Sequence, residues 1–254
     1  KEMNKEMNKE MNKEMNKNKP HKINYLKKSA FTKTHACIMN ELINSNTNGK
    51  FIMLFDLETT GLPIQPCFDR YHSYKMLNYY ENSRTVQFGA QIYLIKDNTS
   101  CQLIKEYNIL IKPDNYEIKN THIHKIKHED AMTYGIPFVN MINEISKEFK
   151  YLSLIVAHNI QFDINVLLSE MYRYNLHSQL EEFENIPTFC TSRETKDLLK
   201  IPYGWNQYKL PKLVELYKWL FNKNAPNNMH NALQDTKVLV ECFFELLNRK
   251  LFKI

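Results

Sequence analysis

The chain has 254 residues, of which 43% are hydrophobic, so it is long and apolar enough for one globular domain with further segments attached. Its five cysteines are scattered without a CxxC pair, which argues against a disulfide framework or a zinc site and suits a reducing compartment. Neither a signal-peptide core nor an apolar run of the roughly 20 residues that a membrane helix needs is visible, and we therefore expect an intracellular protein, cytoplasmic or nuclear, with no membrane contact.

The N-terminal segment differs in charge from the rest of the chain. Residues 1–36 contain ten lysines and four glutamates and carry the whole net charge of +6, whereas the remainder has 24 basic and 24 acidic residues. Residues 1–16 are four copies of Lys-Glu-Met-Asn, and a period of four builds no fixed apolar stripe on a helix. We predict a disordered, low-complexity basic tail at 1–36. The alternative is a basic arm that holds nucleic acid non-specifically.

The globular body is predicted to span residues 50–254, after a linker at 37–49 that includes a short helix at 37–44. Its first element is a continuous apolar run at 51–56 that ends in an acid, a pattern typical of a buried central strand. Hydrophobic patterning then predicts strands at 86–95 and 103–111, a helix at 137–151, a strand at 154–157, a helix at 162–174, a strand at 189–191, and closing helices at 210–221 and 231–247. The first three strands are expected to form an antiparallel meander. Together these elements predict an α/β fold, a mixed sheet with helices on its faces.

An insertion at residues 63–84 is rich in aromatic side chains. Five of them fall in this one segment: Phe68, Tyr71, Tyr74, Tyr79 and Tyr80. We interpret them as a small satellite core under a long loop. The alternative is that they stack unpaired nucleic-acid bases.

The first motif with chemical content is DLETTGL at residues 56–62. Alternation along a strand places Asp56 and Glu58 on the same face. Two neighbouring carboxylates repel each other and raise each other's pKa unless a cation lies between them. A ligand set made of oxygen atoms alone suits Mg²⁺ or Mn²⁺. Gly61 allows a ligand to approach the backbone closely. The alternative interpretation is a strand that ends in a polar turn.

A second motif, HNIQFD at residues 158–163, follows the predicted strand at 154–157. Asp163 falls in the first turn of the next helix, where the helix dipole favours a carboxylate, so helix capping is the alternative interpretation. The preceding His158 and Asn159 lie at the carboxyl end of a strand, which is where open α/β sheets bind their ligands.

The third motif is HNALQDT at residues 230–236, at the start of the last predicted helix. His230 and Asp235 are five residues apart and therefore do not share a helix face. They can converge only if His230 lies in the loop before the helix. Taken singly, both residues are also compatible with ordinary helix capping.

Together, the three motifs closely resemble those of the DEDDh exonucleases, the DnaQ-like, ribonuclease H-like 3′–5′ exonuclease family, over about residues 50–247. The related DEDDy enzymes have a tyrosine four residues before the last aspartate, where this chain has Asn231, so the histidine subclass is indicated. Weaker matches follow in order at 111–113 and 123–126, although Lys125 stands where the family usually has glycine.

The resemblance implies a ribonuclease H-like exonuclease domain at 50–254 that binds two Mg²⁺ or Mn²⁺ ions. Its implied metal ligands are the four acids, Asp56, Glu58, Asp163 and Asp235. His230 is the implied general base, and nucleoside 5′-monophosphates are the implied products. The implied substrate contacts are Thr59, Gly61, Leu62, His158, Asn159 and Phe162. A core-packing role is the alternative for Leu62 and Phe162.

Three functional hypotheses follow. The first is a catalytic exonuclease whose partner is a nucleic acid with a free 3′ end, expected to be single-stranded DNA, within a polymerase, replication or repair complex. The second is an RNA 3′-end-processing exoribonuclease with the same chemistry. The third is a non-catalytic nucleic-acid-binding module or polymerase accessory subunit, against which the presence of all four acids and His230 counts.

Overall fold

The computed structural model describes residues 49–67, 70–97, 100–204, 207–227 and 229–253. The tail predicted at 1–36 and the short helix predicted at 37–44 lie outside these residues.

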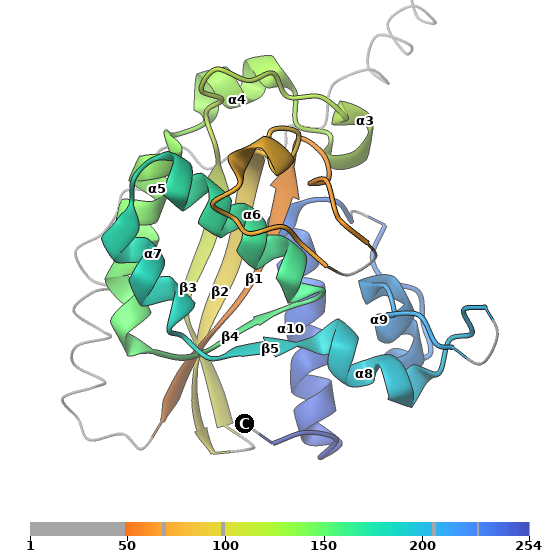
Figure 1. The fold of residues 1–254 in the computed structure, drawn as a ribbon. Coiled ribbons are helices and arrows are strands. Elements are labelled where there is room, and N and C mark those ends of the chain that lie inside the picture. The colour runs from red at the N-terminus through yellow and green to blue at the C-terminus, as the bar shows by residue number, and fades with distance from the viewer. Residues whose placement is uncertain (1–48, 68–69, 98–99, 205–206, 228, 254) are drawn as a thin grey trace, which may run out of the picture. The chain divides into compact units, whose positions relative to one another are not determined.

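Five strands form one mixed sheet at the centre of the body (Figure 1). They are β1 (Lys50–Thr59), β2 (Thr85–Asp97), β3 (Ser100–Leu110), β4 (Leu152–Ala157) and β5 (Thr188–Cys190), in the spatial order β3-β2-β1-β4-β5. The pairs β1–β2 and β2–β3 are antiparallel, whereas the pairs β1–β4 and β4–β5 are parallel. The predicted meander and the predicted mixed α/β sheet are therefore both confirmed. β1 is the middle strand of the sheet, and its apolar run is therefore buried on both faces.

Helices cover the sheet and connect its strands (Figure 1). They are α3 (Thr121–His124), α4 (His128–Tyr134), α5 (Phe138–Ile145), α6 (Ile160–Arg173), α7 (His177–Glu184), α8 (Thr191–Leu199), α9 (Leu213–Phe221) and α10 (Ala232–Asn248), with 3₁₀ helices η1 (Leu77–Tyr79) and η2 (Ser146–Tyr151). None of the helices in the described part of the chain has both the length and the apolar composition needed to cross a lipid bilayer.

The two faces of β1 pack against different helices. Phe51, Met53 and Phe55 belong to a large core cluster with residues of α5, α6 and α7. Ile52 and Leu54, which alternate with them, belong to a second cluster with residues of α10. Continuing this alternation directs the side chains at positions 56 and 58 toward the face that α10 covers.

The sequence prediction differs from the structure at several boundaries. The helix predicted at 137–151 is α5 followed by the tighter helix η2, and β4 begins at Leu152, two residues early. Two full helices, α7 and α8, and the short α3 and α4 were not predicted. The sequences of α7 and α8, HSQLEEFE and TSRETKDLL, have few apolar residues, so their hydrophobic periodicity is weak.

The insertion at 63–84 is held largely by its own aromatic side chains. Tyr80 is fully buried and donates a hydrogen bond from its hydroxyl to the His72 carbonyl, 2.5 Å away. Tyr79 stacks on the ring of His72 at a centroid distance of 3.6 Å, and the Tyr74 hydroxyl donates to Glu184 of α7 at 3.1 Å. These contacts support the satellite-core interpretation for the three tyrosines. Phe68 lies outside the described residues.

Candidate active site

Three carboxylates from two distant parts of the chain meet at one end of the sheet. Asp56 and Glu58 lie near the carboxyl end of β1, and Asp235 lies in the first turn of α10. One carboxylate oxygen from each lies within 4.8 Å of the others. This spacing allows all three to coordinate a single cation.

The start of α10 reaches the acids because β2 has no side chain at Gly89. Gly89 pairs with Asp56 across the β1–β2 ladder, and a Cβ added there would lie 2.3 Å from backbone atoms of Ala232. Two further hydrogen bonds fix the helix: Gln87 Oε1 accepts from the Ala232 amide at 3.1 Å, and the Thr236 hydroxyl donates to the Gly89 carbonyl at 3.0 Å. The sequence motifs gave no indication of this docking contact.

Asp163 approaches the same end of the sheet from α6 but is not one of the three converging acids. Its side chain is 3% exposed, and one oxygen accepts a hydrogen bond from the Leu57 amide at 3.2 Å. Its charge nevertheless raises the pKa of both Asp56 and Glu58, so the four acids form one electrostatic cluster.

His230 lies in the loop before α10, the position that convergence with Asp235 requires. Its backbone has φ 70°, and its amide donates to both carboxylate oxygens of Asp235, at 3.3 and 3.2 Å. Asn231 caps the helix by accepting from the Gln234 amide at 3.3 Å. The His230 residue is exposed at the rim of the acid cluster. The left-handed backbone therefore turns the chain so that His230 and Asp235 are neighbours despite their spacing.

Burial and mutual repulsion raise the pKa values of the clustered acids. Burial is the largest cause at Asp56, whose pKa lies well above its ordinary value, followed by the charges of the other three acids. Burial and the charges of Asp235 and Asp163 raise the pKa of Glu58 to about 8. Burial raises the pKa of Asp235 to about 6, against the opposing effect of His230. No lysine or arginine of the described residues forms an ion pair with any of the four.

This donor set fits a hard divalent cation. Among the described residues only carboxylate oxygens converge here, which suits Mg²⁺ or Mn²⁺ better than a softer metal. Because no lysine or arginine of these residues pairs with the acids, a bound ion would relieve the repulsion that adds to the effect of burial on their pKa values.

The turn after β1 is tightly folded. The Thr59 hydroxyl donates to the Gly61 carbonyl at 2.7 Å, and the Thr60 hydroxyl donates to the Asn82 carbonyl at 3.0 Å. A Cβ added to Gly61 would lie 2.8 Å from the same Asn82 carbonyl, so only glycine fits. Leu62 follows with 76% of its surface exposed, and the core-packing alternative for Leu62 is therefore wrong.

A cavity of about 450 Å³ opens beside this turn, between segments that are distant in sequence. It is lined by Leu62, Pro63, Gln65, Tyr71, His158, Asn159, Phe162, Ser192, Leu210, Pro211, Lys212 and Leu213. Phe162 also packs against the large core cluster, which supports the core-packing alternative, and its role as a substrate contact stays a prediction. Of the six predicted substrate contacts, Leu62, His158, Asn159 and Phe162 line the cavity. The other two lie in the adjoining turn, Thr59 at its start and Gly61 within it.

His158 is fixed in the cavity wall by hydrogen bonds to both ring nitrogens. Nε2 lies 2.8 Å from the Pro211 carbonyl, and Nδ1 lies 2.9 Å from the Thr191 hydroxyl. Burial lowers its pKa to about 4, so the ring is neutral at pH 7. A neutral ring donates from Nε2 to the carbonyl and accepts from the hydroxyl, which joins β4, α8 and the segment before α9.

The mixed sheet with acids at the end of its central strand defines the class of protein: it has the ribonuclease H-like exonuclease fold. The model of the exonuclease family RNase_T matches residues 53–243, which is most of the chain. The chain therefore belongs to this exonuclease family, as the three motifs predicted. No curated protein matches the sequence significantly.

Solved structures with the same fold include several of exonuclease I. The complex of the Escherichia coli enzyme with a dA16 oligonucleotide is 17% identical, covers 80% of this chain and 42% of that chain, and has a TM-score of 0.57. The zinc-bound form of the same enzyme with single-stranded DNA is 18% identical, with 79% and 41% covered and a TM-score of 0.55. The enzyme from Methylocaldum szegediense is 17% identical, with 79% and 41% covered and a TM-score of 0.56. This chain spans less than half the length of those proteins.

Proposed function

We propose that this protein is a metal-dependent 3′–5′ exonuclease that releases nucleoside 5′-monophosphates, with single-stranded DNA as its preferred substrate. The observation that carries the proposal is the convergence of Asp56, Glu58 and Asp235 within 4.8 Å, beside Asp163, with no ion pair to a lysine or arginine in the part of the chain that the structure describes. Membership of an exonuclease family supports the reaction class.

The four acids would hold the metal ions. Asp56, Glu58 and Asp235 would share one ion, and Asp56 would share a second with Asp163, directly or through water. When bound, two such ions supply charge compensation for the attacking and leaving oxygens of an in-line displacement. The Leu57 amide orients Asp163, and the His230 amide orients Asp235, so the carboxylates are positioned before substrate binds.

His230 would accept the proton of the attacking water. The water oxygen bonds to phosphorus while the bond to the 3′-oxygen of the penultimate nucleotide breaks, and that oxygen takes up a proton as it leaves. An exposed histidine at the rim suits this step, because its ring is open to solvent and can pass on the proton that it accepts. His158 does not compete for the role, since both of its ring nitrogens are hydrogen-bonded.

The cavity beside Leu62 would receive the 3′-terminal nucleotide. The exposed Leu62 faces it from one side, and Asn159, which precedes α6, lines it together with Phe162 of that helix. Backbone of the turn at Thr59 and Gly61 would contact the terminal sugar. Recognition of an end by this pocket accounts for an exonuclease rather than an endonuclease.

The preference for DNA rests on the solved relatives of the fold. Their structures contain single-stranded DNA, dA16 and dT13 oligonucleotides. An exoribonuclease would use the same acids, so the sugar of the substrate has to be tested directly. A non-catalytic module is disfavoured because all four acids and His230 are present.

The test is digestion of matched DNA and RNA 20-mers that carry a label at either end, with Mg²⁺ or with EDTA. We expect 3′-labelled DNA to release labelled mononucleotide at once, and 5′-labelled DNA to shorten in single-nucleotide steps. The Asp56→Asn variant should do neither. Release of mononucleotide first from the 5′ end, internal cleavage, or undiminished activity in EDTA would contradict the proposal, and faster RNA digestion would favour the exoribonuclease.

A further inference from the structure

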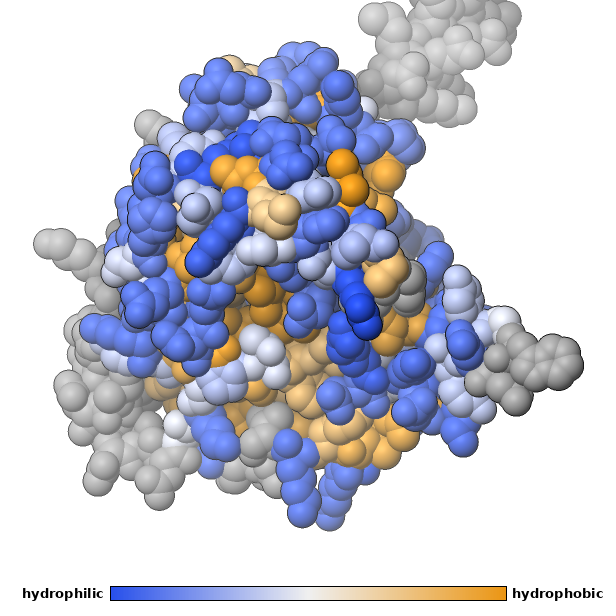
Figure 2. Space-filling view, viewed as in Figure 1, coloured by the Kyte–Doolittle hydropathy of each residue, from blue (hydrophilic) through white to orange (hydrophobic). Residues whose placement is uncertain are grey.

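A basic loop lies beside the acids. Residues 118–128, here called the α3 loop, contain Lys119, Lys125 and Lys127 and no acidic residue, on a body with balanced charge. All three lysines are exposed, and none forms an ion pair within the described part of the chain. Figure 2 shows a mainly hydrophilic surface over α3 and α4. The loop is therefore a local positive patch whose lysines are not paired with any described acid.

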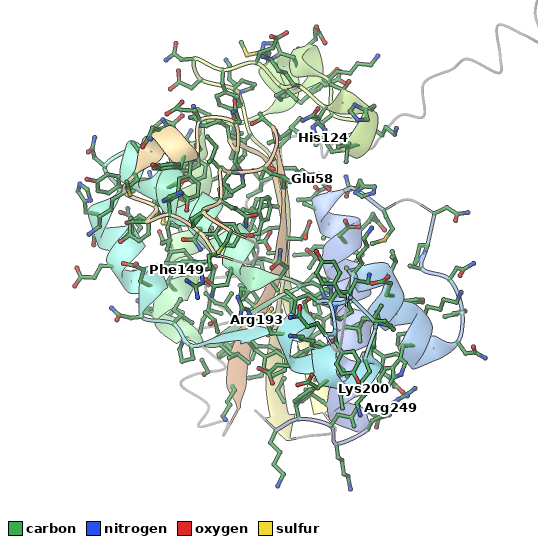
Figure 3. The ribbon with its side chains drawn as sticks, turned by 45° about the vertical axis from the view of Figure 1, so that its right-hand side comes forward. Glu58, His124, Phe149, Arg193, Lys200 and Arg249 are labelled. Atoms are coloured by element: carbon green, nitrogen blue, oxygen red, sulfur yellow. The ribbon has the colours of Figure 1, made fainter. Side chains whose placement is uncertain are left out.

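The α3 loop is tied to the end of the sheet that carries the acids. The side-chain amide of Asn120 donates to the Thr60 carbonyl, 2.8 Å away, in the turn that follows β1. Figure 3 shows His124 at the same end of the sheet as Glu58. Burial is the main cause that lowers the pKa of His124, and the charges of His122 and His230 add to it, so the His124 and His230 rings lie within electrostatic range. The loop thus forms part of the rim of the acid cluster.

Buried His124 gives the loop a defined backbone. Its Nε2 lies 3.2 Å from the Lys119 carbonyl, and its Nδ1 accepts from the Ile126 amide at 3.1 Å. The Lys125 amide donates to the Thr121 carbonyl at 3.0 Å. The position from which the Lys125 side chain leaves the backbone is therefore held by three hydrogen bonds.

Lys125 occupies a backbone conformation that favours glycine. Its φ is 62°, in the left-handed region that a residue with a Cβ adopts at a cost. The side chain is exposed, and its ammonium group contacts the His122 carbonyl of the same loop. No core contact accounts for a long side chain here, whereas a site for a polyanion accounts for an ammonium group on its rim.

We propose that Lys125 binds a backbone phosphate of the substrate strand, and that Lys119 and Lys127 strengthen the positive field around it. This rests on the proposed function: if the 3′-terminal nucleotide is in the acid site, every other phosphate lies on the 5′ side of the scissile bond and must leave across the rim. A phosphate contact carries no sequence information, so the contribution should be equal for different bases.

The test compares Lys125→Gly, Lys125→Arg and wild type for binding to fluorescent (dT)12 and (dA)12, in Ca²⁺ and at several salt concentrations. We expect Lys125→Gly to bind both strands roughly 3- to 10-fold more weakly at low salt, and to lose about 0.7 from the slope of log affinity against log salt. Lys125→Arg should bind as wild type does. The control is Lys50→Ala, which removes an exposed lysine at the opposite end of β1 and should change neither quantity.

Two further measurements separate the phosphate contact from other effects. Glycine suits the left-handed backbone, so the Lys125→Gly protein should melt no lower than wild type. It should also hydrolyse the p-nitrophenyl ester of thymidine 5′-monophosphate, which has no upstream phosphate, at the wild-type kcat/KM.

Unchanged binding and salt slope in Lys125→Gly would overturn the proposal, as would an equal loss on the small ester. Because binding in Ca²⁺ does not depend on turnover, a wild-type protein that binds the strands through Lys125 but hydrolyses nothing would support this contact while refuting the proposed activity.

Discussion

Helix α6 carries two buried carboxylates that the protein treats differently. Asp163 and Glu170 lie two turns apart and are 3% and 1% exposed. Glu170 forms a two-pronged ion pair with Arg84, whose Nε contacts one oxygen and whose Nη2 lies 3.2 Å from the other. Asp163 accepts a hydrogen bond from the Leu57 amide and has no cation among the described residues.

The difference lies in the source of the countercharge. Burial raises the pKa of both acids, and at Glu170 the hydrogen bond and charge of Arg84 oppose that rise. Asp163 has only backbone amides to oppose it and adds its own charge to three further acids. We infer that Glu170 is a structural acid, complete within the fold, whereas the cluster around Asp163 is completed by cations from solution.

The largest expected effect is on stability. Glu170→Gln leaves the Arg84 guanidinium buried without its charged partner, so the free energy of unfolding should fall by about 3–5 kcal/mol. Chemical denaturation measures this directly. Nuclease activity per folded molecule at low temperature should remain close to wild type, and a selective loss of activity without destabilisation would contradict the structural assignment.

The matching change at Asp163 should instead reduce activity and leave the fold stable. Asp163→Asn keeps the acceptor for the Leu57 amide but removes a charge from the cluster. Activity should therefore fall by more than about 100-fold, which is at least as large as the loss seen when residues that support metal ligands are replaced. The free energy of unfolding measured in EDTA should stay constant or increase, because repulsion is relieved. Wild-type turnover by this variant would show that Asp163 is not part of the site.

A change in β2 separates the position of the acids from their charge. Gly89→Ala keeps every acid, but its Cβ would lie 2.3 Å from the start of α10 and must displace Asp235. We expect a loss of about 1–3 kcal/mol in stability together with weaker Mn²⁺ binding. Ala90→Gly, at the next position of the same strand, is the control: it should lower stability without affecting Mn²⁺ affinity.

The smallest effect is a pH dependence of the metal-free protein. The pKa values of Glu58 and Asp235, about 8 and about 6, exceed the roughly 4 expected for unfolded acids, so folding takes up protons between about pH 4 and pH 8. The contribution of these protons to the free energy of unfolding is fully present below pH 4 and is lost as the pH rises to 8. In EDTA, Tm should therefore fall between pH 6 and pH 8, by roughly 2–4 °C for each kcal/mol by which the free energy of unfolding decreases. Mg²⁺ should reduce the fall, and Glu58→Gln should reduce it without Mg²⁺.

The elements that sequence alone could predict are those with strong local patterns. The apolar run of β1 and its two terminal acids follow from alternation along one strand, and the position of His230 before α10 follows from its spacing to Asp235. The family resemblance supplied what spacing could not, that the three motifs belong to one site. Helices α7 and α8 escaped prediction because their polar sequences carry little periodicity.

The docking of α10 could not be predicted because it depends on contacts between distant segments. In the sequence, Gly89 is an unfavourable residue inside a strand, and only the structure shows Ala232 packed against it. Gln87 is likewise only a polar residue of β2 until the structure shows that its side-chain oxygen accepts a hydrogen bond from the Ala232 amide at the start of α10. The same holds for His158, which as a motif residue suggested substrate contact but also joins three segments through its hydrogen bonds.

The most direct measurement is a calorimetric titration of Mn²⁺ into metal-free protein at pH 7. Wild type should bind saturably and release protons, because Glu58 with a pKa of about 8 is mostly protonated before the ion arrives. Glu58→Gln should bind far more weakly and release fewer protons. No saturable binding by the wild type, or equal binding by both proteins, would contradict a cation site at the end of β1.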